Sequence, residues 1–240
     1  KKQKAAENEN TVAPATETLE QNYMPYAMSV IISRAIPEID GFKPSHRKLL
    51  YTMYKMGLLS GARTKSANIV GQTMRLNPHG DAAIYETMVR LSKGYDALLT
   101  PFIDSKGNFG KVYSRDMSYA ASRYTEAKLS PICADIFGDI DKDTVEFNDN
   151  YDGSMKEPAL LPTTFPNVLV SSNTGIAVGM ASQICGFNLE ETCRAAIEYL
   201  QDPECDLFLF LPAPDFSTGG EIIYDRAEME TIYNTGRGSF

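Results

Sequence analysis

The sequence predicts an α+β fold, and three observations lead to this class. Apolar residues recur at helical spacing in several stretches before residue 95, which favours amphipathic helices. The stretch "PALLPTTFPNVLVSSNTGIAVGMAS" is punctuated by prolines and carries short β-branched runs, which are typical of strands and loops. Between these regions, "LLTPFIDSKGNFGKVYSRDM" combines short-strand residues with the turn residues Gly107 and Gly110.

Two helices are expected near the start of the chain. "MPYAMSVIISRAIPE" has apolar residues at helical spacing and is limited by Pro37. A turn at "DG" follows, and a helix entered at Pro44 carries one broad apolar face to a stop at Gly57. Residues 1–22 are polar and lack the apolar core of a signal peptide, so we expect a flexible arm that becomes helical near Thr16.

Two further helices are predicted from "SANIVGQTMRL" and "DAAIYETMVRLSK", joined by the turn "NPHG". In the second, Ile84, Met88 and Leu91 share one face and Asp81 is the expected N-cap. Two short helices joined in this way resemble a helix-turn-helix, which places its second helix in a DNA groove, although many helical hairpins bind nothing. With the short-strand stretch after it, this unit suggests a winged-helix arrangement.

The rest of the chain is expected to contain one helix from Ser118 through Tyr124 and a second subdomain of helices and strands that starts near residue 155. In this subdomain "NLEETCRAAIEYL" predicts a helix capped by Asn188. "PDFSTGGEIIYD" and the final "YNTGRGSF" predict strands. Because the sequence stops as a strand would begin, we expect a fragment of a longer protein.

The composition is that of a globular protein large enough to bury a sizeable core, with 43% hydrophobic and 22% charged residues among 240. No apolar run approaches the ~20 residues that span a bilayer. The four cysteines form no CxxC pair and only two histidines are present, so we expect no zinc site. The expected location is the cytoplasm.

The net charge of −8 argues against a nucleic-acid partner, but it hides an asymmetry. Residues 34–75 carry a net charge of +6, residues 76–130 of +1 and residues 131–240 of −14. Such a division is typical of a polyanion-binding face with an acidic remainder. A solvated basic surface without a ligand explains the same charges equally well.

"SRYTEAKL" places Arg123 directly before Tyr124, one of thirteen tyrosines. With a reference pKa near 10, about one phenol in a thousand is ionised at pH 7, so a tyrosine nucleophile needs nearby cations. Arg34 and the basic run from Lys43 to Lys48 would supply them if the helices converge. A tyrosine with such neighbours can attack a phosphodiester and form a phosphotyrosine, but the pair "RY" alone is weak evidence for catalysis.

Six stretches in one order resemble a known family: "YAMSVIISRAIPEIDGFKPSHRKLLYTM", "NPHGDAAIYETMVRLS", "GNFG", "SRYTEAKL", "NDNYDGSMKEPALLPTTFPNVLV" and "TGIAVGMAS". From about Tyr23 to Phe240 the chain resembles the breakage-reunion subunit of bacterial type IIA DNA topoisomerases, which is the A subunit of DNA gyrase and of topoisomerase IV. The resemblance implies a flexible arm over residues 1–22, a winged-helix DNA-binding domain over 23–154 and the first part of an α/β tower domain over 155–240.

The resemblance also implies a strand-cleaving site. Tyr124 would become linked to a DNA 5′-phosphate, with Arg123 and Arg34 stabilising the transition state. The residues implied to bind DNA are Lys43, His46, Arg47, Lys48, His79 and Ile176, the last as a wedge between base pairs. From the residues alone, four rival interpretations stay open: Arg34 as a solvated helix arginine, His46 as a core histidine, His79 as a turn residue and Ile176 as a strand core residue.

The cofactors and partners follow from the same resemblance. No nucleotide-binding loop and no TOPRIM motif occurs in this sequence, so Mg²⁺ and ATP would both be held by the partner, the family's B subunit, and none by this chain alone. The implied partners are double-stranded DNA, the ATPase and TOPRIM partner just named, and a second copy of this chain in an A₂B₂ heterotetramer, with no membrane.

The sequence departs from the family pattern at several positions. Asn77 replaces the first histidine of "HPHGD", and Lys48 replaces an arginine and loses its bidentate geometry. Ala82 stands where most members carry a serine that helps to anchor quinolone drugs through a water–metal bridge, while Glu86 keeps the acidic position one turn later. We therefore expect weak quinolone binding. The segment between "GNFG" and "RYTE" is about two residues longer than in typical gyrase.

Two other functions remain open at this point. One is a winged-helix DNA-binding protein without chemistry, which would use the same basic residues for phosphate contacts. The other is a degenerate, purely structural paralogue of the topoisomerase protein. The sequence does not distinguish gyrase from topoisomerase IV.

Overall fold

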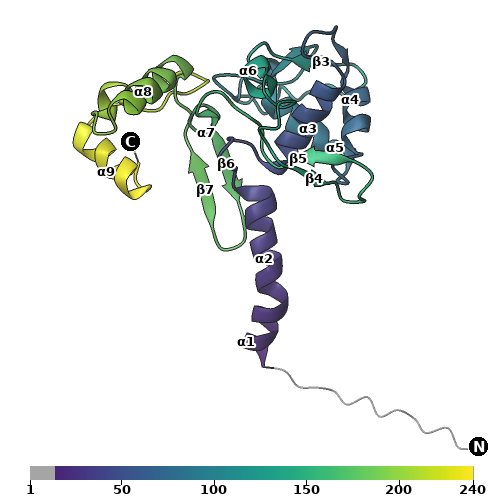
Figure 1. Cartoon of the computed structure of the whole chain (residues 1–240), viewed down its shortest axis with the longest axis horizontal. Helices are drawn as coiled ribbons and strands as arrows, with labels where there is room; N and C mark the ends of the chain where they lie inside the picture. Colours follow the sequence, from purple (N-terminus) through teal and green to yellow (C-terminus); the bar gives the residue numbers. More distant parts are fainter. Residues whose placement is uncertain (1–13, 240) are drawn as a thin grey trace, which may run out of the picture.

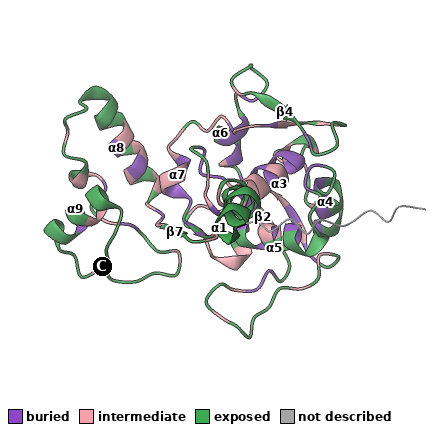
Figure 2. Ribbon diagram, turned by 90° about the horizontal axis from the view of Figure 1, so that it is seen from below, coloured by how far each residue is buried: buried purple, intermediate pink, exposed green. Residues whose placement is uncertain are grey.

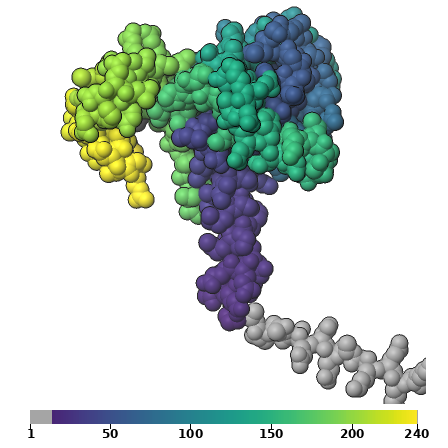
Figure 3. Space-filling view, in the orientation of Figure 1, coloured from purple at the N-terminus to yellow at the C-terminus, as the bar shows by residue number. Residues whose placement is uncertain are grey.

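The computed structural model describes residues 14–239, and its mixture of helices and short strands confirms the predicted α+β class (Figure 1). A long helical arm leads into a central body, and a lobe that contains α8 and α9 lies on the opposite side of the body from α4. The space-filling view shows the same three parts, with the arm projecting as a narrow column below the body (Figure 3).

The helical arm consists of four consecutive segments without a break. They are α1 (Ala15–Thr18), the π-helical η1 (Leu19–Tyr23), α2 (Met24–Val30) and the π-helical η2 (Ile31–Ala35). Of the flexible arm expected over residues 1–22, residues 1–13 lie outside the described residues, and the rest is helical from Ala15 onwards. The arm ends at Ala35 because Pro37 forces Ile36 into an extended conformation, with φ −99° and ψ 134°.

Three helices form the framework of the body, and all three agree with the sequence-based prediction. They are α3 (Pro44–Lys55), α4 (Ser66–Thr73) and α5 (Asp81–Leu91). Gly57 follows the end of α3 with a φ of +72°, as expected for a left-handed stop. The predicted cap of α5 is shifted by one residue: Gly80 is the N-cap, and Asp81 is the first helical residue, whose carboxylate accepts a hydrogen bond from the Ala82 amide.

A small antiparallel sheet packs beside these helices. Its strands are β1 (Thr64–Lys65), β2 (Ile103–Lys106) and β3 (Glu126–Leu129), in the order β1-β3-β2, with the short helices η3 (Lys93–Tyr95) and α6 (Cys133–Phe137) adjoining it in sequence. Ile103 lies opposite Leu129 and Lys106 opposite Glu126. The largest fully buried side chains form one core between helices and sheet: Phe42, Leu49, Leu50, Met53, Ile69, Ile84, Met88, Phe102, Ile103, Phe109, Leu129 and Phe137.

The predicted helix from Ser118 through Tyr124 is wrong. Residues 118–121 have no regular structure, Tyr124 lies in a turn, and the chain then enters β3. The reason is tertiary: the Thr125 and Ser122 carbonyl groups accept hydrogen bonds from the amides of Ser66 and Ala67 at the start of α4, and these bonds hold the segment in its turn.

The remaining elements follow β3 and α6 in the chain. They are β4 (Phe147–Asp149), β5 (Lys156–Pro158), α7 (Asn167–Val170), β6 (Asn173–Ile176), β7 (Ala181–Ile184), α8 (Leu189–Gln201), η4 (Leu207–Leu209) and α9 (Arg226–Thr235). β4 pairs with β5 and β6 with β7, each as an antiparallel hairpin. The Asn188 side chain caps α8 as predicted, by accepting from the amides of Glu190 and Glu191.

Two strand predictions in the C-terminal lobe are wrong. "EIIYD" has no strand pairing, and "YNTG" belongs to the end of α9. Asp225 caps this helix by accepting from the Glu228 amide, and Gly236 ends it in the left-handed region with φ 66°. Figure 2 shows that buried residues concentrate in the body, whereas α9 is exposed along almost its whole length.

Candidate active site

The turn that carries Tyr124 is held by hydrogen bonds on both sides. The Ala67 amide donates to the Ser122 carbonyl at 3.1 Å, and the Ser66 amide donates to the Thr125 carbonyl at 3.0 Å. The Thr125 hydroxyl donates to the Ser66 hydroxyl at 2.8 Å, and both residues are fully buried. The turn is therefore fixed at the first residues of α4, where helical amides lack partners within their own helix.

Tyr85 attaches the same turn to α5. Its hydroxyl lies 2.8 Å from the Thr125 hydroxyl and donates to the Ala120 carbonyl at 2.8 Å. Burial raises the pKa of Tyr85, so it stays a neutral hydrogen-bond donor. The core thus positions both ends of the segment from Ala120 to Thr125.

Tyr124 itself points outward. Its side chain is 65% exposed, and the guanidinium carbon of Arg123 lies 4.7 Å from the centre of its ring, in cation–π contact. An exposed phenol beside an arginine on a rigid turn is open to a macromolecular substrate, whereas most core tyrosines are not.

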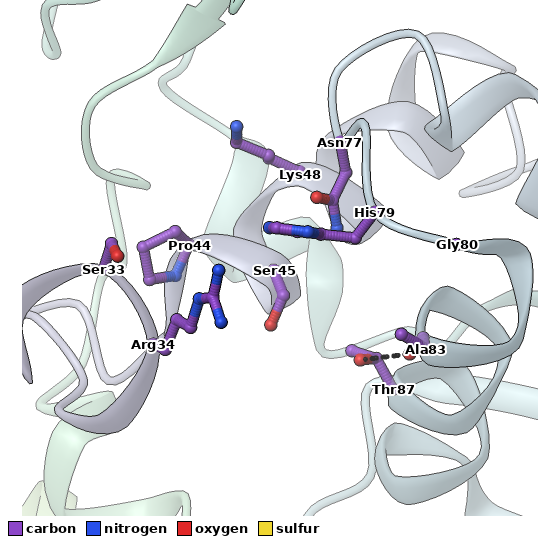
Figure 4. Close-up of a pocket in the computed structure, with 10 residues that line it drawn as sticks. All are labelled: Ser33, Arg34, Pro44, Ser45, Lys48, Asn77, His79, Gly80, Ala83 and Thr87. Carbon is purple, nitrogen blue, oxygen red and sulfur yellow. Dashed lines mark hydrogen bonds between the residues drawn. The ribbon is translucent and has the colours of Figure 1, made fainter. Parts of the chain in front are cut away.

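A basic pocket of about 560 Å³ lies between η2, the first turns of α3 and the start of α5 (Figure 4). Arg34 from η2 and His79 from the turn before α5 point into the same space. The pocket is lined by Ser33, Arg34, Pro44, Ser45, Lys48, Asn77, His79, Gly80, Ala83 and Thr87. Three predicted site residues, Arg34, Lys48 and His79, are thus brought together although they are far apart in the sequence.

Tyr124 does not line this pocket. The sequence predicted that these basic residues would lie around Tyr124 if the helices converged. In a single chain, the basic pocket does not include this tyrosine. Ala82 and Glu86 lie exposed on α5, where Glu86 forms an ion pair with Arg90 at 3.0 Å.

Two cations, Lys43 and Arg90, lie close to His46 around the start of α3. The pKa of His46 is lowered to about 3 by burial and then by Lys43, Arg90 and Arg47, so this histidine is neutral at pH 7. Burial and then Arg90 also lower the pKa of Lys43. Sequence reasoning missed Arg90, because nothing local distinguishes it from any solvated helix arginine.

Two of the predicted DNA contacts are engaged within the chain. Arg47 is buried and forms a two-pronged ion pair with Asp40, at 2.8 and 2.9 Å. Lys48 lies 3.2 Å from a Glu157 carboxylate oxygen and donates to the Leu76 carbonyl at 3.0 Å. Arg47 therefore faces the interior, whereas Lys48 still borders the basic pocket.

Ile176 lies at the end of β6 and is 84% exposed. A core role, which the sequence left open for this residue, does not agree with that exposure. The β6–β7 hairpin lies beside the helical arm (Figure 1), and the Lys43 ammonium group donates to the Thr174 carbonyl at 2.8 Å.

Within residues 14–239, no group of three or more His, Cys, Asp or Glu side chains is arranged to hold a metal ion. In the same part of the chain, no helix combines the length and the apolarity needed to cross a membrane.

Comparison with known proteins gives a consistent result. The family of the DNA gyrase/topoisomerase IV A subunit matches residues 34–240. The chain is 47% identical over 227 residues to the A subunit of DNA topoisomerase 4 from Neisseria gonorrhoeae, covering 92% of this chain and 29% of that protein. It is 46% identical over 226 residues to the A subunit of DNA gyrase from Haloquadratum walsbyi, covering 92% of this chain and 26% of that protein.

A third relative is the A subunit of DNA gyrase from Thermotoga maritima, which is 43% identical over 231 residues, covering 94% of this chain and 28% of that protein. The chain therefore spans less than a third of the length of these relatives. The family match covers the turn that carries Tyr124, the β6–β7 hairpin and the basic pocket except for Ser33. By this match, the chain belongs to the family of DNA gyrase and topoisomerase IV A subunits.

Proposed function

We propose that this chain is the DNA-cleaving and religating part of a type IIA topoisomerase A subunit. The observation that carries the proposal is the exposed Tyr124 under the guanidinium of Arg123, on a turn that buried hydrogen bonds fix to α4 and α5. Family membership supports it, because the same turn lies inside the matched region. The holoenzyme would pass one duplex through a transient double-strand break and change DNA supercoiling or catenation.

The domain arrangement is part of this proposal. α4 and α5 would be the helix-turn-helix, the β2–β3 sheet with its connecting segment would be the wing, and residues 23–154 would form one winged-helix domain. Residues 155–240 would begin a tower domain. The exposed face of α5, which bears Ala82, Glu86 and Arg90, would lie against the duplex.

The chemical step would be a transesterification at phosphorus. The Tyr124 phenol oxygen attacks the phosphodiester, a bond from this oxygen to phosphorus forms, and the bond from phosphorus to the deoxyribose 3′ oxygen breaks. The phenol proton leaves and the 3′ oxygen gains one, so charge and atoms balance. Arg123 stabilises the charge that builds on the non-bridging oxygens. The free 3′-hydroxyl reverses the step by attacking the phosphotyrosine.

The basic pocket would hold backbone phosphates of the bound duplex. Arg34, Lys48 and His79 line it, and Arg34 and His79 point into the same space, while Lys43 donates to the Thr174 carbonyl of the β6–β7 hairpin. Since Arg47 is paired with Asp40 and His46 is neutral, we propose that these two act by shaping the start of α3, with phosphate contact left to their neighbours. Ile176, at the exposed end of β6, would wedge between base pairs.

Mg²⁺ and ATP would enter with the partner. The described residues do not fit a metal site, because no three metal-ligating side chains come together among them, and no step above is routed through a metal held by this chain. We propose that the partner is the B subunit, which carries the TOPRIM and ATPase domains. We also propose an A₂B₂ assembly with a second copy of this chain, and a cytoplasmic location.

The test is a covalent trap. The full-length protein that contains this chain is incubated with its B subunit, Mg²⁺ and end-labelled supercoiled DNA, and SDS then denatures the protein. A protein–DNA adduct that disappears in Tyr124→Phe and persists in Tyr113→Phe, another exposed tyrosine, supports the proposal. Salt-sensitive DNA binding without an adduct would instead assign a binding protein without chemistry.

A further inference from the structure

A buried polar network around Asp40 joins segments that are distant in the sequence. The Asp40 carboxylate is 2% exposed and accepts from the Phe42 amide at 3.1 Å, from the Arg47 guanidinium at 2.8 and 2.9 Å and from the Leu161 amide at 2.9 Å. The Asp40 carbonyl accepts from the Asn167 side-chain amide at 2.8 Å. One residue thus joins the loop before α3, α3 itself and the segment leading to α7.

On one side, this network sets the start of α3. The Arg47 guanidinium also donates to the Phe42 carbonyl at 3.2 Å, so the loop and the first turn of α3 are held as one unit. Lys43 and Pro44 lie between these two anchors and border the hairpin and the basic pocket respectively.

On the other side, it sets the start of the β6–β7 hairpin. Asn167 is fully buried and is the first residue of α7, and β6 begins at Asn173, shortly after this helix ends. The loop touches this helix directly, because a Cβ on Gly41 would lie 2.8 Å from backbone atoms of Asn167 and Val168. Gly41 also has a φ of +78°, in the left-handed region. This position therefore requires glycine both for its backbone conformation and for the close approach to α7.

The hairpin then returns to the helical arm. A Cβ on Gly175 would lie 2.0 Å from the Ala35 carbonyl oxygen, so β6 passes in backbone contact with the residue after Arg34. Lys43, from the loop before α3, also bonds to this hairpin, because its ammonium group donates to the Thr174 carbonyl. Ile176 therefore stands at a fixed place relative to both Arg34 and Lys43.

We propose that Asp40 and Asn167 are positioning residues that fix the spacing between the Ile176 wedge and the phosphate-binding cations. This inference rests on the proposed function. It adds a structural link between the bending of the DNA duplex and the contacts to its phosphates. A wedge bends a duplex productively only if the flanking phosphates are held at a matching distance. The Asp40–Arg47–Asn167 network supplies that distance through directional bonds.

Stability alone is a weaker explanation for the network. A buried ion pair contributes little net stability compared with apolar packing of similar volume. Asn167 also leaves its side-chain carbonyl oxygen buried without a partner among the described residues, which costs stability. What its amide group supplies is a defined direction toward the Asp40 carbonyl.

The test uses Asn167→Ala in the full-length protein together with its B subunit. This change removes the bond between the loop and α7 and leaves the Asp40–Arg47 pair in place. The matched control is Thr192→Val, which removes a buried hydroxyl that bonds only within its own helix, to the Asn188 carbonyl. Bending of a duplex labelled with a donor and an acceptor dye is measured by energy transfer, and affinity for the same duplex by fluorescence anisotropy.

We expect Asn167→Ala to lower the bent fraction by at least about threefold, with affinity changed less than the bend, and Thr192→Val to change neither. In an Ile176→Ala background, Asn167→Ala should cause no further loss of bending, because the wedge is already gone. Asp40→Asn should also lower the bent fraction, because it weakens the carboxylate's bonds to Arg47 and to the Leu161 amide while it keeps the main-chain carbonyl that Asn167 contacts.

Two results would overturn the inference. One is wild-type bending in Asn167→Ala, and the other is a bending loss that adds to that of Ile176→Ala. A wild-type assembly that neither bends DNA nor forms the Tyr124 adduct would instead refute the proposed function, and with it this inference.

Discussion

The Arg123 guanidinium carbon lies 4.7 Å from the centre of the Tyr124 ring, in a turn whose phenol is exposed. An arginine held against the ring of the proposed nucleophile lies where charge would develop during attack on phosphorus. The same arginine can order the phenol before DNA arrives.

Replacement of Arg123 should therefore slow cleavage more than it weakens binding. For Arg123→Ala we expect a fall of about 10²–10³-fold in the single-turnover cleavage rate, since one transition-state donor is lost. Arg123→Lys should recover only part of this rate because lysine lacks the planar fork. Arg115→Ala, which removes a cation from the preceding loop, is the control. Equal losses in binding and in rate would exclude a transition-state role.

Neutralising Glu157 should strengthen DNA binding. Its carboxylate lies 3.2 Å from the Lys48 ammonium group at the edge of the basic pocket and offsets that charge. In Glu157→Gln we expect affinity to rise about two- to fivefold and the salt dependence to steepen, as for one added phosphate contact. Anisotropy titrations from low to moderate salt measure both. The exposed Glu146→Gln is the matched control, and an identical gain there would indicate a general charge effect.

His46 should make the protein sensitive to mild acid. Its pKa is lowered from 6.5 to about 3 by burial and by Lys43, Arg90 and Arg47, so the unfolded chain binds the extra proton between these two values. Stability contributed by neutral His46 is complete above about pH 6.5 and declines as the pH falls toward 3. Urea unfolding of wild type and His46→Gln at about pH 7 and about pH 5 should converge at the lower pH. A constant difference between the two proteins would contradict the prediction.

Gly175 should tolerate no side chain. A Cβ there would lie 2.0 Å from the Ala35 carbonyl oxygen, so Gly175→Ala must push β6 away from the arm. We expect a loss of about 1–3 kcal/mol in unfolding free energy. Gly71→Ala is the opposite case: Gly71 lies in α4 with nothing within 4 Å of its Cβ position, and this change should stabilise by about 0.5–1 kcal/mol. Urea unfolding of the two variants should show shifts of opposite sign.

Quinolone sensitivity should depend on position 82. Ala82 is exposed on α5 one turn before Glu86, and its methyl group cannot hydrogen-bond a water. Ala82→Ser should lower the drug concentration that traps half of the cleavage complexes. Equal sensitivity of the two proteins would refute the expectation.

The helices of the body could be predicted from the sequence because their signals are local. Pro44, Gly57 and Asn188 each lie at a helix end and act through their own backbone or side chain. The same kind of signal was present for α9, where Asp225 caps the helix and Gly236 follows it. The β-branched pair in "EIIYD" favours a strand, but it has no pairing partner in the described chain.

The site was predictable in its residues but not in its arrangement. The buried position of Arg47 depends on its ion pair with Asp40, in the loop before α3, and the Asp40 carboxylate is held in turn by the Leu161 amide, far later in the chain. The proximity of Arg90 to Lys43 and His46 depends on how α5 packs near α3, and no spacing in the sequence encodes it. The turn at Tyr124 has no local signal, because Ser66 and Ala67, whose amides bond to the Thr125 and Ser122 carbonyls, belong to another element.

The π-helical turn η2 makes the orientation of the helical arm before it depend on chain length. The Ile36 amide bonds to the Ile31 carbonyl, five residues back, so this last turn holds one residue more than an α-helical turn. Loss of a single residue between 31 and 33 would restore ordinary α-helical geometry and rotate everything before it by about 100° relative to the body. The wide turn thus fixes how the arm is rotated about its axis relative to the pocket. A one-residue deletion would change which face of the arm points outward, while Arg34 and the side chains after it would stay in place.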